Sequence, residues 1–225
     1  MPQIVKRVGL VQQEKDSQKM FRLDTHKIPR HIFRTYDIRG NTITDLSADL
    51  VHDIGLALGT EVLEAGATTM IVGRDGRLSS PVLHQALTDG ILATGCNILD
   101  IGVVPTPLLY FATQKLASTS GVMLTGSHNP KDDNGLKTVI AGKTLTEDQV
   151  QDVLHRIEKR DVRTGKGEVS HYANIIHDYI EDVIQRIPLK KKLKVVVDAG
   201  NGATALVAPD LYRAMGCEVT ALFVL

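Results

Sequence analysis

The residues best suited to chemistry lie in the segment Thr125–Pro130 (TGSHNP), which directly follows a short apolar run. In open α/β sheets, ligands bind beyond the carboxyl ends of the strands, so a loop at this place can present the hydroxyl of Ser127 to a substrate. His128, the next residue, could carry a proton or contact a phosphate group. An ordinary polar turn has the same composition and is the alternative. The Gly-x-Ser-x-Gly pattern of serine hydrolases is absent around Ser127.

A lysine follows this loop closely in the sequence. Lys137 comes ten residues after Ser127 and two residues after the pair Asn134-Gly135. Because Asn-Gly is a strong hairpin-turn signal, we predict a turn there that returns Lys137 to the serine loop. Its ammonium group would then neutralise a phosphoryl group carried by the hydroxyl. A solvated lysine on a strand is the alternative.

Two arginine-containing segments are further candidates for phosphate contacts. Phe33–Gly40 (FRTYDIRG) contains Arg34, Asp37 and Arg39. The planar guanidinium group suits bidentate phosphate binding, but a charged strand with a local ion pair would have the same sequence. The segment Gly73–Arg77 (GRDGR) follows a predicted strand. It is either a phosphate-side loop or a structural ion-pair turn, and we favour the structural interpretation.

Two glycine-rich patterns suggest nucleotide binding. Gly142-Lys143-Thr144 resembles the end of a P-loop, but the required first glycine would fall at Lys137, so the pattern fails. Residues 200–205 (GNGATA) fit the dinucleotide pattern G-x-G-x-x-A, which makes a nicotinamide-binding module an alternative function. The acidic residue of that fingerprint belongs at the end of the next strand, whereas Glu218 is expected at its beginning. The histidines show no metal-ligand spacing, and the carboxylates form no local metal-binding cluster.

Elements of alternating type must position these residues. Apolar residues with helical spacing, the Ser80-Pro81 start signal and a Thr146/Gln149 capping box predict the helices, and short apolar runs predict the strands. This alternation predicts an α/β fold, a three-layer αβα sandwich around a mostly parallel mixed sheet, followed by the start of a second similar domain. The expected helices span 46–64, 80–94, 108–116, a segment after 146, 172–187 and 203–215, and the expected strands span 69–72, 97–101, 120–124, 136–140, 193–197 and 217–225.

The domain organisation follows from composition. We expect a flexible N-terminal extension over residues 1–30, a first domain over 31–171 and the beginning of a second domain over 172–225. The charged segment 158–171 is expected to contain a linker. One βαβ unit is too little to close a parallel sheet, so we expect a truncated chain whose last strand, 217–225, presents an unpaired apolar edge.

Charge and composition exclude several function classes. The chain has 225 residues, with 26 Lys and Arg against 26 Asp and Glu, a net charge of zero. A nucleic-acid-binding protein or a polybasic membrane-surface protein would carry a basic excess, so neither partner is expected. No apolar run reaches the roughly 18 residues of a membrane helix, and residues 1–30 lack the apolar core of a secretory signal. Cys96 and Cys217 are too few for a disulfide scaffold, which favours a reducing, cytoplasmic location.

Taken together, the motifs resemble the α-D-phosphohexomutase family, in particular its phosphomannomutase/phosphoglucomutase branch. The resemblance runs from about residue 32 to residue 225, and TGSHNP followed by NG-x-K is its most specific combination. Related glucosamine mutases typically carry alanine before the serine, so Gly126 favours the mannose/glucose branch. The matching blocks are Phe33–Gly40 (FRTYDIRG), Gly73–Ser79 (GRDGRLS), Val104–Pro107 (VPTP), Gly121–Pro130 (GVMLTGSHNP), Asn134–Lys137 (NGLK) and Val195–Gly202 (VVVDAGNG).

The resemblance implies a phosphoserine mechanism. Ser127 would carry a phosphoryl group and exchange it with a hexose phosphate, through a hexose 1,6-bisphosphate, to interconvert the 1-phosphate and the 6-phosphate. A metal ion, usually Mg²⁺, would bind an oxygen of the phosphate on Ser127. Arg39 and Lys137 match residues around the reacting centre, His128 matches the histidine beside the nucleophile, and Tyr36 matches a substrate-side residue. In such a site, positioning and charge neutralisation supply most of the catalysis.

The sequence also departs from the family pattern. Family enzymes have four domains, and the DGDxDR-type metal loop, the sugar-reading loop and the clamp for the distal phosphate lie outside these 225 residues. We therefore expect an N-terminal fragment with little turnover of its own. A catalytically inactive remnant that acts as a binding or assembly module is the alternative. No oligomeric state is predicted.

Overall fold

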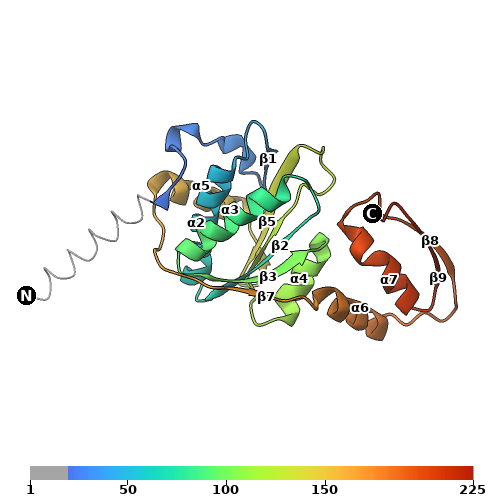
Figure 1. The fold of residues 1–225 in the computed structure, drawn as a ribbon. Helices are drawn as coiled ribbons and strands as arrows, with labels where there is room; N and C mark the ends of the chain where they lie inside the picture. Colours follow the sequence, from blue (N-terminus) through green and yellow to red (C-terminus); the bar gives the residue numbers. More distant parts are fainter. Residues whose placement is uncertain (1–19, 225) are drawn as a thin grey trace, which may run out of the picture.

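The computed structural model describes residues 20–224 and contains a seven-stranded sheet with helices on both faces (Figure 1). Along the sheet the order is β1-β5-β4-β2-β3-β7, with β6 paired to β5. The strands are β1 (Ile38–Asn41), β2 (Thr69–Arg74), β3 (Asn97–Val103), β4 (Gly121–Leu124), β5 (Asp133–Ile140), β6 (Lys143–Thr144) and β7 (Val169–His171). The helices around this sheet are α2 (Ala48–Glu64), α3 (Ser80–Ala93), α4 (Thr106–Lys115), α5 (Glu147–Lys159) and α6 (Ile175–Arg186).

The pairing pattern confirms a mostly parallel mixed sheet. β4, β2, β3 and β7 are parallel neighbours, whereas β5 is antiparallel to β1, β4 and β6. In the described part of the sheet, β5 is therefore the strand that runs against the rest. Its register sets Arg39 of β1 opposite Gly135 and Met123 of β4 opposite Lys137. This register brings residues from three distant segments to one part of the sheet.

Alternating side chains of the central strands fill two separate apolar layers. Met70 and Val72 of β2 belong to the cluster that α2, α3 and α5 cover, and Ile71 between them belongs to the cluster under α4. Successive side chains of a strand point to opposite faces, so this division is the period of two expected for a sheet covered on both sides. The three-layer αβα prediction is confirmed.

Helices α2 and α3 pack unusually closely. A Cβ atom on Gly90 would lie 2.1 Å from the carbonyl oxygen of His52, so only hydrogen fits at that position. Thr146 with Gln149 forms the predicted capping box of α5, and Pro81 lies in the first turn of α3 as predicted. The N-cap expected at Ser80 is wrong, because α3 begins at Ser80 itself and the Ser80 hydroxyl donates to Asp75.

The second, smaller unit consists of β8 (Lys194–Asp198), the 3₁₀ helix η3 (Ala203–Leu206), α7 (Ala208–Ala214) and β9 (Glu218–Leu222). Strands β8 and β9 pair in parallel, so one βαβ unit forms as expected. The continuous helix expected over 203–215 is wrong, because the chain leaves helical geometry at Val207, just before Pro209 in the first turn of α7. Helix α6 lies beside α4 (Figure 1), where Phe111 and Tyr179 meet edge to face at a centroid distance of 5.4 Å.

The second unit exposes some apolar side chains. Among the described strands, β9 pairs with β8 alone, and Val196, Leu222 and Phe223 are exposed. The edge expected for the last strand is thus unpaired in the described residues, but it is not uniformly apolar, because Glu218 and Thr220 are exposed on it too. In residues 20–224, no helix combines the length and the apolar character needed to cross a bilayer.

Two expected loose segments are packed instead. The flexible extension 1–30 is wrong for residues 20–30, because the main-chain N–H groups of Arg22 and Leu23 donate to the buried carboxylate of Asp53, at 3.0 and 2.9 Å. Residues 1–19 of that extension lie outside the described residues. The linker expected within 158–171 also packs against the first domain: Gly165 and Gly167 donate to main-chain carbonyls at the end of α3, and β7 joins the sheet beside β3.

Candidate active site

The serine loop connects β4 to β5 at the carboxyl end of β4. Ser127 and His128 are exposed, and Ser127 has a left-handed backbone with φ 50°. Its N–H donates to Thr125 Oγ1 at 2.8 Å, and its Oγ lies 3.4 Å from Nδ1 of His128. The hydroxyl is therefore presented to solvent with a proton-exchanging group beside it, as the sequence predicts.

The hairpin turn lies at a different place from the one predicted. Asn134 and Gly135 are inside β5, and the turn is formed by the serine loop itself. Asn134 is 0% exposed, and its Nδ2 donates to the hydroxyls of Ser79 and Ser80 at 2.9 and 3.0 Å. These tertiary hydrogen bonds outweigh the local turn preference of Asn-Gly. The hairpin still returns β5 along β4, which brings Lys137 into the site.

Arg39 and Lys137 converge on one carboxylate. Asp37 Oδ2 accepts hydrogen bonds from Arg39 Nη2 at 2.7 Å and from Lys137 Nζ at 3.1 Å. Lys137 Nζ also lies 5.6 Å from the ring centroid of Tyr36. Arg39 Nη1 donates to Asn129 Oδ1 at 3.3 Å, which connects this cluster to the serine loop. The predicted residues Tyr36, Arg39 and Lys137 are thus brought together beside the loop, and the local ion pair considered for Asp37 is present.

The electrostatics of this cluster favour the charged forms. Burial alone would raise the pKa of Asp37, but hydrogen bonds and charge attraction from Arg39 and Lys137 outweigh burial and hold that pKa below its ordinary value. The hydrogen bond to Asp37 raises the pKa of Arg39. Two cations share one anion, so the cluster can attract a phosphate. Asp37 was a candidate only as an ion-pair partner, and its role in holding both cations was missed. The available signal was its spacing of two residues from Arg39, just before β1.

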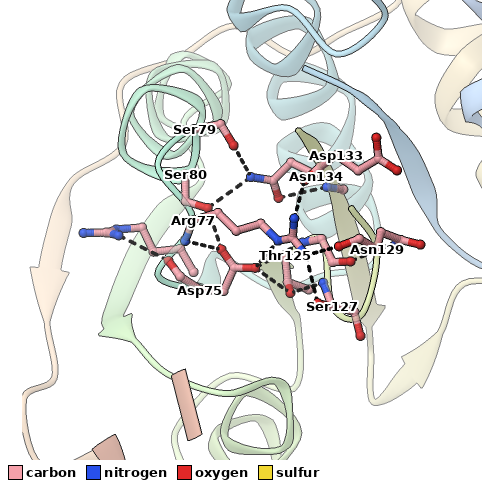
Figure 2. A network of polar contacts seen from close by, with 12 residues as sticks. Asp75, Arg77, Ser79, Ser80, Thr125, Ser127, Asn129, Asp133 and Asn134 are labelled. Carbon is pink, nitrogen blue, oxygen red and sulfur yellow. Dashed lines mark hydrogen bonds and ion pairs between the residues drawn. The ribbon is translucent and has the colours of Figure 1, made fainter. Parts of the chain in front are cut away.

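The segment Gly73–Arg77 has the structural role that we favoured (Figure 2). Arg77 Nε lies 3.2 Å from Asp75 Oδ2, and the guanidinium also donates to main-chain carbonyls of the serine loop. Asp75 Oδ2 accepts from Thr125 Oγ1 and from the N–H of Gly126, at 2.9 and 3.1 Å. This ion pair therefore supports the serine loop through hydrogen bonds, and both of its residues also line the cavity beside that loop.

A cavity of about 990 Å³ opens in front of the serine loop. Its walls come from the serine loop, the turn Gly76–Ser79, the start of α4 and the loop 201–204. The loop 200–205 thus faces the same space but does not continue into a regular helix, since η3 and α7 are separated at Val207. A dinucleotide site needs a helix N-terminus at that loop, so the geometry does not favour the nicotinamide alternative.

The described residues do not make a metal site by themselves. Between residues 20 and 224, no group of three or more His, Cys, Asp or Glu side chains could hold a metal ion. A Mg²⁺ site formed by such a protein cluster therefore does not fit these residues. The phosphate on Ser127 stays the one metal ligand that we predict in this chain.

Comparison with known proteins shows the family of this chain. The sequence pattern of the family described as "Phosphoglucomutase/phosphomannomutase, alpha/beta/alpha domain I" matches residues 30–164, which include every candidate catalytic residue. The chain belongs to the phosphoglucomutase/phosphomannomutase family. Its relatives include the phosphomannomutase/phosphoglucomutase of Pseudomonas putida, 50% identical over 87% of this chain, and the phosphoglucomutase of Neisseria meningitidis serogroup B, 42% identical over 87% of this chain.

Family membership also explains the fold. The crystal structure of a phosphoglucomutase/phosphomannomutase family protein from Burkholderia thailandensis superposes with a TM-score of 0.84 at 42% identity, over 88% of this chain. The chain covers 42% of the Pseudomonas putida protein and 44% of the Burkholderia thailandensis chain. It therefore spans less than half the length of these family members.

Proposed function

We propose that this chain is the phosphoserine-carrying part of a phosphohexomutase that interconverts the 1-phosphates and 6-phosphates of mannose, glucose or both. The observation that carries the proposal is the exposed Ser127 hydroxyl at the carboxyl end of β4. The same loop contains Asn129, which accepts a hydrogen bond from Arg39, and Arg39 shares the Asp37 carboxylate with Lys137. The names of the relatives from Pseudomonas putida and Neisseria meningitidis support this activity.

The proposed reaction transfers two different phosphoryl groups, one in each step. First, the O–P bond at Ser127 Oγ breaks and a new O–P bond forms to the free hydroxyl of a hexose phosphate, while the proton of that hydroxyl ends on Oγ. The hexose 1,6-bisphosphate then returns its other phosphoryl group to Ser127, and the proton moves back to the sugar oxygen. His128 Nδ1, 3.4 Å from Oγ, is placed to relay that proton.

The charged groups of this chain would stabilise the phosphoryl group in the transition state of the transfer. Arg39 and Lys137 supply fixed positive charge, and Asp37 holds both side chains in place without any rearrangement during the reaction. Tyr36, whose ring centroid lies 5.6 Å from Lys137 Nζ, would contact the substrate beside this lysine. A Mg²⁺ ion bound to the phosphate would neutralise further charge when present.

Direct phosphorylation tests the proposal. The chain is incubated with glucose 1,6-bisphosphate, and its intact mass and peptide fragments are measured. We expect one added phosphoryl group on Ser127 and none in Ser127→Ala. Ser170→Ala, which removes a hydroxyl from β7 far along the sheet, is a matched control and should be phosphorylated like the wild type. Phosphate that stays on Ser127→Ala, or no phosphate on the wild type, contradicts the proposal.

Turnover by the isolated chain is a separate measurement. Contacts to parts of the substrate remote from the reacting centre contribute to kcat as well as to binding, and this chain covers 42% of its Pseudomonas putida relative. We expect the 225-residue chain to be phosphorylated but to interconvert hexose phosphates slowly or not at all. Rapid mutase turnover by the chain alone would contradict this expectation.

A further inference from the structure

Both sides of the Ser127 peptide are held by residues that the proposed chemistry does not use. We infer that Asp75, Arg77 and Thr125 form a positioning clamp that fixes the backbone of Ser127, and with it the direction of the nucleophilic hydroxyl, before substrate binds. The inference rests on the proposed function, in which Ser127 carries the phosphoryl group.

Arg77 holds the carbonyl side of the loop (Figure 2). Its Nη2 donates to the carbonyl oxygens of Ser127 and Asn129 at 2.9 and 2.8 Å, and its Nη1 donates to those of Pro130 and Asp133. The remaining donor, Nε, faces Asp75 at 3.2 Å. A guanidinium has five N–H groups, so these contacts use its donors on protein acceptors. Arg77 therefore shapes the loop: although it lines the cavity, its donors are already bonded to protein acceptors.

Thr125 holds the amide side of the loop. Its hydroxyl accepts the Ser127 N–H at 2.8 Å and donates its own proton to Asp75 Oδ2 at 2.9 Å. The Asp75 carboxylate thus acts on Ser127 through one hydroxyl. Ser80 Oγ fixes the other oxygen of Asp75 at 2.6 Å, so the carboxylate has little freedom to turn.

The backbone of Ser127 explains why a clamp is needed. The left-handed backbone region is unfavourable for a residue that has a side chain, and Ser127 lies in it, with φ 50°. Hydrogen bonds on both sides of the residue can hold that conformation. Gly126 completes the arrangement, because a Cβ atom there would lie 2.4 Å from Arg77 Cζ. The guanidinium therefore packs directly against the backbone just before the nucleophile.

Variants of Thr125 test whether its hydroxyl positions Ser127 or only stabilises the fold. Thr125→Val has the same shape as the wild type but can neither accept from Ser127 nor donate to Asp75. Thr125→Ser keeps both hydrogen bonds. As a matched control, Thr113→Val removes the hydroxyl of a buried threonine in α4 whose hydrogen bond goes to Tyr110. All three variants are compared with the wild-type chain.

Two readouts are measured on each variant: the amide hydrogen exchange of residues 125–129, and the rate at which glucose 1,6-bisphosphate phosphorylates Ser127. For Thr125→Val we expect exchange to rise about tenfold in this loop but not in the sheet, and phosphorylation to slow by about 10- to 100-fold, the usual effect of a nucleophile misplaced by about an ångström. Thr125→Ser and Thr113→Val should stay within about threefold of wild type in both readouts.

The outcomes distinguish the clamp from the proposed function. Wild-type loop exchange and phosphorylation in Thr125→Val overturn the clamp, and so does a loss in Thr125→Ser as large as in Thr125→Val. Increased exchange across the whole sheet in Thr125→Val also overturns it, because the threonine is then only structural. If the wild-type chain is not phosphorylated, the proposed function fails, and loop exchange alone decides whether the clamp exists.

Discussion

Asp37→Asn tests the cation cluster most directly. The Asp37 side chain is 4% exposed and accepts hydrogen bonds from two cations, at 2.7 and 3.1 Å. A hydrogen bond to a charged group contributes about 1.5–3 kcal/mol, and the asparagine amide keeps one acceptor but places two donors near two cations. We therefore expect Asp37→Asn to lower the free energy of unfolding by about 2–4 kcal/mol at neutral pH.

The pH dependence of this difference has a defined sign. The pKa of Asp37 in the folded chain lies below the ordinary value of 3.8, so its stabilisation is complete above that pH and is lost as the pH falls through the folded-state pKa. The advantage of the wild type over Asp37→Asn should therefore be constant from neutral pH down to about 3.8 and shrink below it.

Urea unfolding followed by circular dichroism, repeated over this pH range, measures both effects. Asp132→Asn makes the same substitution at an exposed carboxylate whose partner, Lys131, is also exposed. This control should change the free energy of unfolding by less than about 1 kcal/mol. A difference for Asp37→Asn as small as that of the control, or one that persists unchanged into strong acid, would refute the assignment of Asp37 as the anchor of both cations.

Three further predictions concern other parts of the chain. Gly90→Ala should lower the free energy of unfolding by about 1–3 kcal/mol, because its Cβ would lie 2.1 Å from the His52 carbonyl oxygen. Gly76→Ala is the control and should change this free energy far less, because a Cβ there would have nothing within 4 Å. Equal effects of the two substitutions in urea unfolding would contradict the prediction. Burial raises the pKa of Cys96 to about 11, so iodoacetamide should label this thiol only after unfolding, and peptide mass spectrometry would reveal native labelling. Asp53→Asn removes one acceptor of the N-terminal segment, so trypsin should cleave residues 20–30 faster than in the wild type.

Most of the architecture could be predicted from local patterns. Helices and strands have clear sequence patterns here, because each central strand is covered by helices on both faces and each helix buries one apolar stripe. The prediction failed where a tertiary contact opposed a local preference. The Asn134-Gly135 pair has turn composition, yet the hydroxyls of Ser79 and Ser80 bind the Asn134 amide and keep it in a strand. No local signal contains those partners.

The candidate site was predicted only in part for a similar reason. Ser127, Arg39 and Lys137 have residue types that indicate phosphate chemistry, so the sequence alone singled them out. The holding roles of Asp37 and Asp75 depend on strand register and on contacts between segments far apart in the chain. Packing of residues 20–30 was missed because its anchor is Asp53, a buried carboxylate in a helix about 30 positions away.

The strand register described for β1, β4 and β5 has a consequence for insertions in the chain. Arg39 and Lys137 lie on two adjacent strands, so their mutual placement depends on the pairing of those strands and not on the length of the loop. Inserting residues after Pro130 would lengthen the loop and leave both cations where they are. Inserting one residue before Lys137 within β5 would turn that side chain to the opposite face of the sheet. The placement of these two cations is therefore more sensitive to a change in the length of β5 than to a change in the length of the loop.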